Sequence, residues 1–97
     1  MTLETFVNSL TSTTPPAGLS PALQALWFDK RDEWHKAHEA IQNESDPMSA
    51  AIHAYLHRKE GDTWNANYWY RSAGRKVFTG TLHDEWDALV QDACRGA

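Results

Sequence analysis

Apolar residues recur along this chain at the three- and four-residue spacing of amphipathic helices. One such face lies in the first half of the sequence, at Trp34, Ala37, His38 and Ile41. A second lies further on, at Ala66, Trp69, Tyr70 and Ala73. Both patterns predict a helix with one buried side, and we expect Trp69 to be buried in the second.

Capping signals divide these helices from one another. A capping side chain stands before a first-turn proline at two places, Ser20-Pro21 and Asp46-Pro47. Gly61 is suited to end the helix that begins at Pro47, and Asp62 is suited to cap the next one. Gly74 occupies a position where a left-handed residue commonly ends a helix.

A weak internal repeat supports pairing of these helices. An offset of 29 residues places Ala25 on Ala54, Glu33 on Asp62 and Ala37 on Ala66. The small side chains allow two helices to approach closely. Residues 21–74 are therefore predicted to form two helical hairpins, with turns near Arg31 and Gly61.

Each predicted hairpin carries alanine followed four residues later by a larger side chain, in Ala37-x3-Ile41 and Ala66-x3-Tyr70. This element resembles the A-x3-F element of tetratricopeptide repeats, which implies paired helices in an all-α fold. The stretch from Trp34 through Gly74 also resembles a family of small uncharacterised proteins with the motif H-x3-H-R-x-E-G-D-x2-N-A-x-Y-W-Y-x2-A-G. The second resemblance implies no known function.

The two ends of the chain are predicted to add one helix each. Helical spacing of four apolar residues predicts a helix over residues 2–10, at Leu3, Phe6, Val7 and Leu10. It can pack on the body or dock on a second subunit, and residues 11–20 form a linker. Thr81-x-x-Asp84 resembles a capping box ahead of a closing helix over residues 83–94, which we expect to cap the second hairpin.

The sequence is thus predicted to form one all-α domain over residues 1–97. Its 9 basic and 13 acidic residues give a net charge of −4, which does not favour nucleic acid or an anionic membrane as a partner. The single cysteine, Cys94, excludes an intrachain disulfide. A secretory signal and a membrane-spanning apolar run are both missing, so we expect a cytoplasmic protein.

Three histidines are the candidate chemical site. His53 and His57 are separated by one helical turn, and His38 lies on the apolar face of the preceding helix. If the two helices are neighbours, the three imidazoles can hold a divalent metal such as zinc, with water as a fourth ligand. We expect that they bind no cofactor and form hydrogen bonds to the backbone or to Glu60, Asp62 or Tyr70, with the metal site as the alternative.

The acidic residues have a structural interpretation. Four of them are predicted to be solvated on the first hairpin, namely Asp29, Asp32, Glu33 and Glu39. Glu60 and Asp62 are assigned to turn formation and capping. An acid–base pair of carboxylates remains the alternative.

Trp64 and Tyr68 lie one turn apart and face away from the stripe that contains Ala66. We expect a terminal helix to cover them. The alternative is an exposed aromatic patch that binds a peptide, a small ligand or a second subunit.

These observations favour a small helical interaction module that binds a protein or peptide partner or associates with itself as a homodimer. The alternative is a metal- or small-ligand-binding protein centred on the histidines. Whether it is an enzyme is open, and a non-enzyme is favoured because the sequence contains no phosphate-binding loop, nucleophile elbow or CxxC motif.

Overall fold

All regular secondary structure is helical in the part of the protein that its structure, a computed structural model, describes, which is residues 1–95. No strand occurs in that range, so the predicted all-α fold is confirmed. The α-helices are α1 (Leu3–Asn8), α2 (Pro21–Lys30), α3 (Trp34–Ile41), α4 (Pro47–Lys59), α5 (Thr63–Ser72) and α6 (Leu82–Arg95), and a short 3₁₀ helix, η1 (Ser9–Thr11), follows α1. Gly96 and Ala97, the last residues of the predicted domain, lie outside the described residues.

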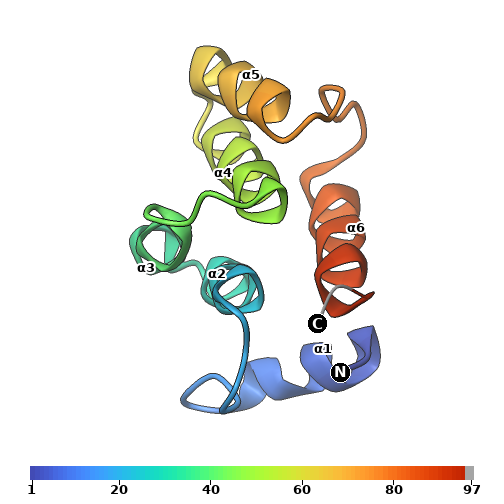
Figure 1. Ribbon diagram of the computed structural model, residues 1–97. Helices are drawn as coiled ribbons and strands as arrows, with labels where there is room; N and C mark the ends of the chain where they lie inside the picture. Colours follow the sequence, from blue (N-terminus) through green and yellow to red (C-terminus); the bar gives the residue numbers. More distant parts are fainter. Residues whose placement is uncertain (96–97) are drawn as a thin grey trace.

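The middle of the chain contains two pairs of neighbouring helices. Helix α2 packs against α3, and α4 packs against α5. The pairs are stacked, with α3 and α2 beneath α4 and α5 in Figure 1. Ala25 and Ala54 are fully buried, as expected for positions where paired helices approach closely.

Local sequence explains where these helices begin and end. The side chains of Ser20, Asp46 and Asp62 accept hydrogen bonds from backbone amides of the helices that follow them. Gly61 and Gly74 have positive φ angles of 84° and 70° and end α4 and α5.

The turn between α2 and α3 has the same conformation as the turn between α4 and α5, but it contains no glycine. At Gly61 the amide donates to the Arg58 carbonyl, and at Asp32 the amide donates to the Asp29 carbonyl. Asp32 has a φ of 60°, the left-handed conformation that glycine usually adopts. The 29-residue offset therefore also relates the two turns.

Helix α6 packs against α2 and α4, so it lies along both hairpins (Figure 1). It was expected to cap the second hairpin, and it contacts α4 of that hairpin but also α2 of the first. Trp86 explains the placement, because its indole nitrogen donates to the Leu26 carbonyl on α2 at 3.0 Å. Its side chain is 1% exposed, which ties α6 to the centre of the molecule.

Helix α1 folds back on the body of the same chain. Phe6 is fully buried and its ring lies 6.0 Å from that of Trp86. The Arg31 guanidinium donates to the carbonyls of Leu10 and Ser12, at 2.6 and 2.7 Å, and so holds the start of the linker. Of the two placements considered for the N-terminal helix, the structure has the one on the body.

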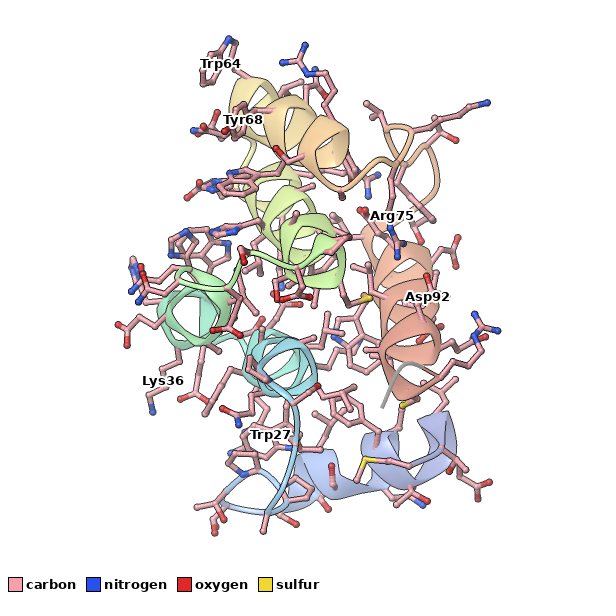
Figure 2. All side chains as sticks on the ribbon, in the orientation of Figure 1. Trp27, Lys36, Trp64, Tyr68, Arg75 and Asp92 are labelled. Carbon is pink, nitrogen blue, oxygen red and sulfur yellow. The ribbon has the colours of Figure 1, made fainter. Side chains whose placement is uncertain are left out.

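Two predictions about α5 were wrong. Trp69 is half-buried rather than buried. Among the described helices only α4 packs extensively against α5, so α5 is covered on one side. Trp64 and Tyr68 are not covered by a terminal helix, and their exposed fractions are 75% and 46%. Both lie on the outer side of α5 (Figure 2).

Candidate functional site

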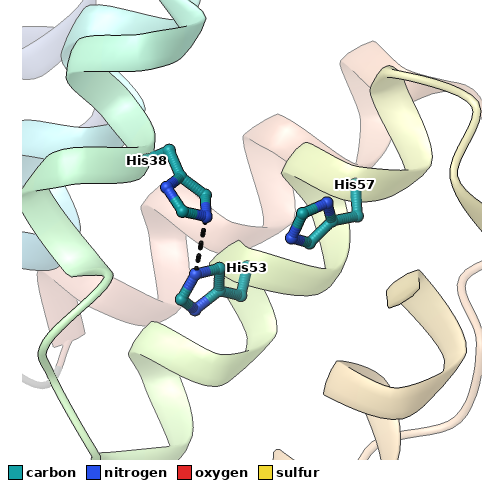
Figure 3. A group of neighbouring side chains, drawn as sticks. All are labelled: His38, His53 and His57. Atoms are coloured by element: carbon teal, nitrogen blue, oxygen red, sulfur yellow. Dashed lines mark hydrogen bonds between the residues drawn. The ribbon is translucent and has the colours of Figure 1, made fainter.

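Helices α3 and α4 bring the three predicted histidines together. His38 comes from α3, while His53 and His57 occupy successive turns of α4 (Figure 3). One potential ligand atom from each ring lies within 4.8 Å of the other two. The convergence depends on the packing of α3 against α4, since His38 is remote from the pair in sequence.

The shortest approach joins His38 and His53. Their Nε2 atoms are 3.1 Å apart, so one of the two must donate and the other must accept. Tetrahedral zinc with bonds of about 2.0 to 2.1 Å requires ligand nitrogens about 3.3 Å apart. The separation of these two atoms is therefore close to that of ligands on one metal ion.

His53 is the most deeply placed of the three. Its exposed fraction is 3%, and its Nδ1 atom is buried with no hydrogen-bond partner among residues 1–95. A buried polar nitrogen without a partner is unfavourable, and such groups often mark the position of a water molecule or an ion. The surroundings of His53 therefore do not satisfy it as a purely structural residue.

The electrostatic environment keeps two of the imidazoles neutral. Burial, together with the neighbouring His38 and His57, lowers the pKa of His53 to about 4. Burial and His57 also lower the pKa of His38, although Glu60 opposes this shift. A neutral imidazole is the form that binds a metal, so both residues are in that form at neutral pH.

A carboxylate orients the third histidine. The Nδ1 atom of His57 lies 2.9 Å from Oε1 of Glu60, at the end of α4. A histidine that ligates a metal through one nitrogen commonly donates from the other to a carboxylate. The contact to Glu60 leaves Nε2 of His57 free to face the other two rings.

Two tryptophans enclose the cluster. Trp34 stacks on His38 with ring centroids 5.1 Å apart, and its indole nitrogen donates to the Leu56 carbonyl at 2.9 Å. Trp69 stacks on His53 at 4.1 Å. These contacts restrict rotation of both imidazoles and place an indole ring directly against each.

Asp62 takes the capping role predicted from the sequence. Its carboxylate accepts from the backbone amide of Asn65 at 3.2 Å and from the side-chain amide of the same residue. His57, Glu60 and Asp62 also form a close group, with potential ligand atoms within 4.8 Å of one another. Glu60 has a role beyond turn formation because it binds His57.

Trp64 and Tyr68 do not join the histidine cluster. They lie near the outer end of α5, where their side chains point away from the rest of the molecule (Figure 2). The predicted ligand-binding residues therefore form two separate features, the histidine cluster and an exposed aromatic pair.

The sequence interpretation missed two buried carboxylates. Asp29 is 1% exposed, accepts from the Tyr55 hydroxyl at 2.6 Å and pairs with Lys59 at 2.9 Å. The prediction that Asp29 is solvated was wrong. Its position on the apolar stripe with Ala22, Ala25 and Leu26 was the signal that could have shown its burial.

Glu85 forms a similar buried network. It is 3% exposed, accepts from the Tyr70 hydroxyl at 2.5 Å and pairs with Arg58 at 2.9 Å. Burial raises the pKa of Tyr70, and the hydrogen bond to Glu85 raises it further, so the hydroxyl remains a donor. The signal again was position, because Glu85 lies on the helical face of Trp86 and Leu89.

Comparisons of the chain with protein-family models, curated proteins and solved structures found no match. The resemblances to tetratricopeptide repeats and to the histidine-containing motif family therefore stay predictions. Within residues 1–95, no helix combines the length and the apolar character that crossing a membrane requires. The cytoplasmic location also stays a prediction.

Proposed function

We propose that this protein binds a divalent transition-metal ion of the zinc class through His38, His53 and His57. The observation that carries the proposal is the convergence of three imidazoles from two helices, with ligand atoms within 4.8 Å of one another. Imidazole suits zinc, copper and nickel, and three imidazoles leave a coordination position for water.

The environment of the cluster supports this proposal over a purely structural one. A structural cluster of polar groups is expected to satisfy its members. Here Nε2 of His38 and Nε2 of His53 share one hydrogen bond, but Nδ1 of His53 has no partner in the described chain. A metal ion would bind the Nε2 atoms of His38 and His53 at once, with the proton that they share moving to Nδ1 of the ring that carried it.

Metal titration of protein purified without a histidine tag tests the proposal. We expect one zinc or cobalt ion per chain, with a change in tryptophan fluorescence because Trp34 and Trp69 stack on two of the ligands. At a metal concentration of 100 times Kd, the free energy of unfolding should rise by about 2.7 kcal/mol.

Matched histidine variants separate the site from adventitious binding. His53→Ala should abolish the stoichiometric binding, whereas His35→Ala should leave it unchanged because His35 is exposed. Circular dichroism should show that both variants keep the helical fold. Binding that is absent in the parent protein, or equal in the two variants, would contradict the proposal.

A second candidate function is a helical interaction module. It is favoured by the exposure of Trp64, at 75%, beside the half-exposed Tyr68. Since α1 is packed on its own chain through Phe6, a protein or peptide partner, or a second copy in a homodimer, would use the α5 surface. Light scattering of the parent and of Trp64→Ala tests self-association, and a monomer mass for the parent at high concentration excludes the homodimer.

A further inference from the structure

The three-histidine group lacks a fourth ligand from the protein. Among residues 1–95, the group of His38, His53 and His57 includes no cysteine, carboxylate or further histidine. Glu60 and Asp62 form a group with His57 but not with the other two rings. Structural zinc sites are usually closed by four protein ligands, whereas catalytic sites have three and keep the fourth position for water or substrate. The three histidines therefore match the ligand set of a catalytic zinc site.

The group is partly open to solvent. The side chains of His38 and His57 are partly exposed, that of His57 to 13%, whereas His53 is buried. The rings of His53 and His57 are parallel, with centroids 5.8 Å apart, and the His38 ring is steeply tilted to both (Figure 3). Trp34 and Trp69 lie against two of the rings and limit the space for a bound molecule. An ion held by the three nitrogens thus has room for water or a small substrate on the side of the exposed rings.

The positive side chains of α3 and α4 are engaged elsewhere. Lys36 on α3 pairs with Glu33, and Arg58 and Lys59 on α4 pair with the two buried carboxylates described above. These three are the lysines and arginines of the two helices. Phosphate and carboxylate groups of substrates are commonly held by arginine or lysine, and Glu60 beside His57 would repel them. The site therefore suits an uncharged substrate.

We infer that, with zinc bound at the three histidines, this site hydrolyses small uncharged carboxylic esters. The inference rests on the proposed metal site. Zinc held by three imidazoles lowers the pKa of its bound water to about 7, so that a hydroxide nucleophile is available at neutral pH. The phosphate-binding loop, nucleophile elbow and CxxC motif, whose absence favoured a non-enzyme, are not needed for this reaction.

The reaction needs no reactant other than the ester and water. The zinc-bound water gives one proton to solvent, and the resulting hydroxide oxygen attacks the carbonyl carbon of the ester. The bond from that carbon to the leaving oxygen breaks, and the leaving oxygen takes a proton from solvent. The products are a carboxylic acid and an alcohol, and no atom is oxidised or reduced.

Hydrolysis of p-nitrophenyl acetate by protein loaded with one zinc ion tests the inference. The rate should exceed those of metal-free protein and of free zinc at the same concentration by at least about tenfold, since metal activation of water and of the carbonyl lowers a barrier by more than about 1.4 kcal/mol. p-Nitrophenyl phosphate, which is anionic, should show no such acceleration. Failure to accelerate hydrolysis of the acetate, or equal acceleration of the phosphate, would overturn the inference.

Matched histidine variants show whether the site causes the reaction. His57→Ala should remove the acceleration, whereas His83→Ala should retain it, because His83 lies on α6 and outside the histidine group. His57 is the suitable ligand to truncate, since its side chain is partly exposed and its loss leaves the core intact. A His57→Ala variant as active as His83→Ala would overturn the inference.

Cobalt-loaded protein tests the open coordination position without measuring activity. Azide should displace the bound water and change the visible absorption spectrum of the cobalt ion. A spectrum that azide does not alter would overturn the inference. Stoichiometric metal binding without ester hydrolysis would overturn the inference and leave the proposed metal site standing, whereas the absence of stoichiometric metal binding would overturn both.

Discussion

Two kinds of buried polar cluster occur in this protein, and they differ in how completely their members are satisfied. The carboxylates of Asp29 and Glu85 each accept from a tyrosine hydroxyl and pair with a cation. The imidazoles of His38 and His53 instead place two like nitrogens against each other, and His53 retains a buried nitrogen without a partner in the described chain.

This difference separates groups that hold the fold from groups suited to bind something. A satisfied buried carboxylate contributes by connecting helices, since Asp29 on α2 contacts Tyr55 and Lys59 on α4. An imidazole cluster with unmet hydrogen-bonding capacity is a cost to the folded state. We therefore expect the two clusters to respond differently to mutation, pH and metal.

The largest expected change in the free energy of unfolding comes from removing a buried carboxylate whose hydrogen bonds are satisfied. Asp29→Ala removes the acceptor of Tyr55 and the counter-ion of Lys59, and should lower the free energy of unfolding by about 3 kcal/mol. Denaturation with urea measures the change. Glu39→Ala is the matched control, because this exposed carboxylate should contribute less than about 0.5 kcal/mol. Equal unfolding midpoints for the two variants would contradict a structural role for Asp29.

Lowering the pH should destabilise the metal-free protein, because the folded state holds His53 in its neutral form. His53 titrates near 6.5 when unfolded and has a pKa of about 4 in the folded protein, so the unfolded chain binds more protons between these values. The free energy of unfolding of the metal-free protein should therefore be unaffected by His53 above about pH 6.5. It should fall by up to about 3 kcal/mol as the pH falls to 4.

The pH effect can be assigned with two substitutions. His53→Leu removes the titrating group and should flatten the dependence of the unfolding free energy on pH between 4 and 6.5. His83→Ala should retain it, since His83 lies on the exposed surface of α6. An unchanged slope in His53→Leu would show that other groups cause the acid sensitivity.

A smaller effect is expected from the carboxylate that orients His57. Glu60→Gln keeps the size of the side chain but replaces the carboxylate that contacts Nδ1 of His57. Metal affinity should fall about 10- to 100-fold, as is typical for such orienting groups, while the stoichiometry stays the same. Calorimetric titration measures both quantities, and Glu39→Gln serves as the control. An affinity equal to that of the control would remove Glu60 from the site.

The smallest expected effect concerns the exposed aromatic pair. Trp64→Ala should change the free energy of unfolding by less than about 0.5 kcal/mol, because the Trp64 side chain is 75% exposed. Trp69→Ala should cost more, since Trp69 stacks on His53 at 4.1 Å. Thermal or urea denaturation of the two variants compares them, and a larger loss for Trp64→Ala would show that the α5 surface is covered in solution.

Local signals predicted most of the helix boundaries. Ser20, Asp46 and Asp62 cap helices in the structure as the sequence indicated, and Gly61 and Gly74 end them. These features involve residues only a few positions apart, so their energetics are contained in short segments. The burial of Trp69 was mispredicted because periodicity identifies a face but does not say how much of it a neighbouring helix covers.

The candidate site was predictable only in part. The spacing of His53 and His57 places them on the same side of one helix wherever that helix lies. The position of His38 beside them required α3 to pack on α4. Glu60 was assigned to turn formation and was also named as a possible hydrogen-bond partner of the histidines, and the structure has that contact, to Nδ1 of His57.

The positions of the helices and most of their caps follow from the sequence, because backbone hydrogen bonding and hydrophobic periodicity act over short distances. Two other features arise only from the tertiary structure. Helix α6 packs along both hairpins, and Asp29 contacts Tyr55 and Lys59. The convergence of the three imidazoles and the exposure of Trp64 also depend on the tertiary structure. Such outcomes depend on the relative placement of helices, which is set by the packing of the whole core and not by any one segment.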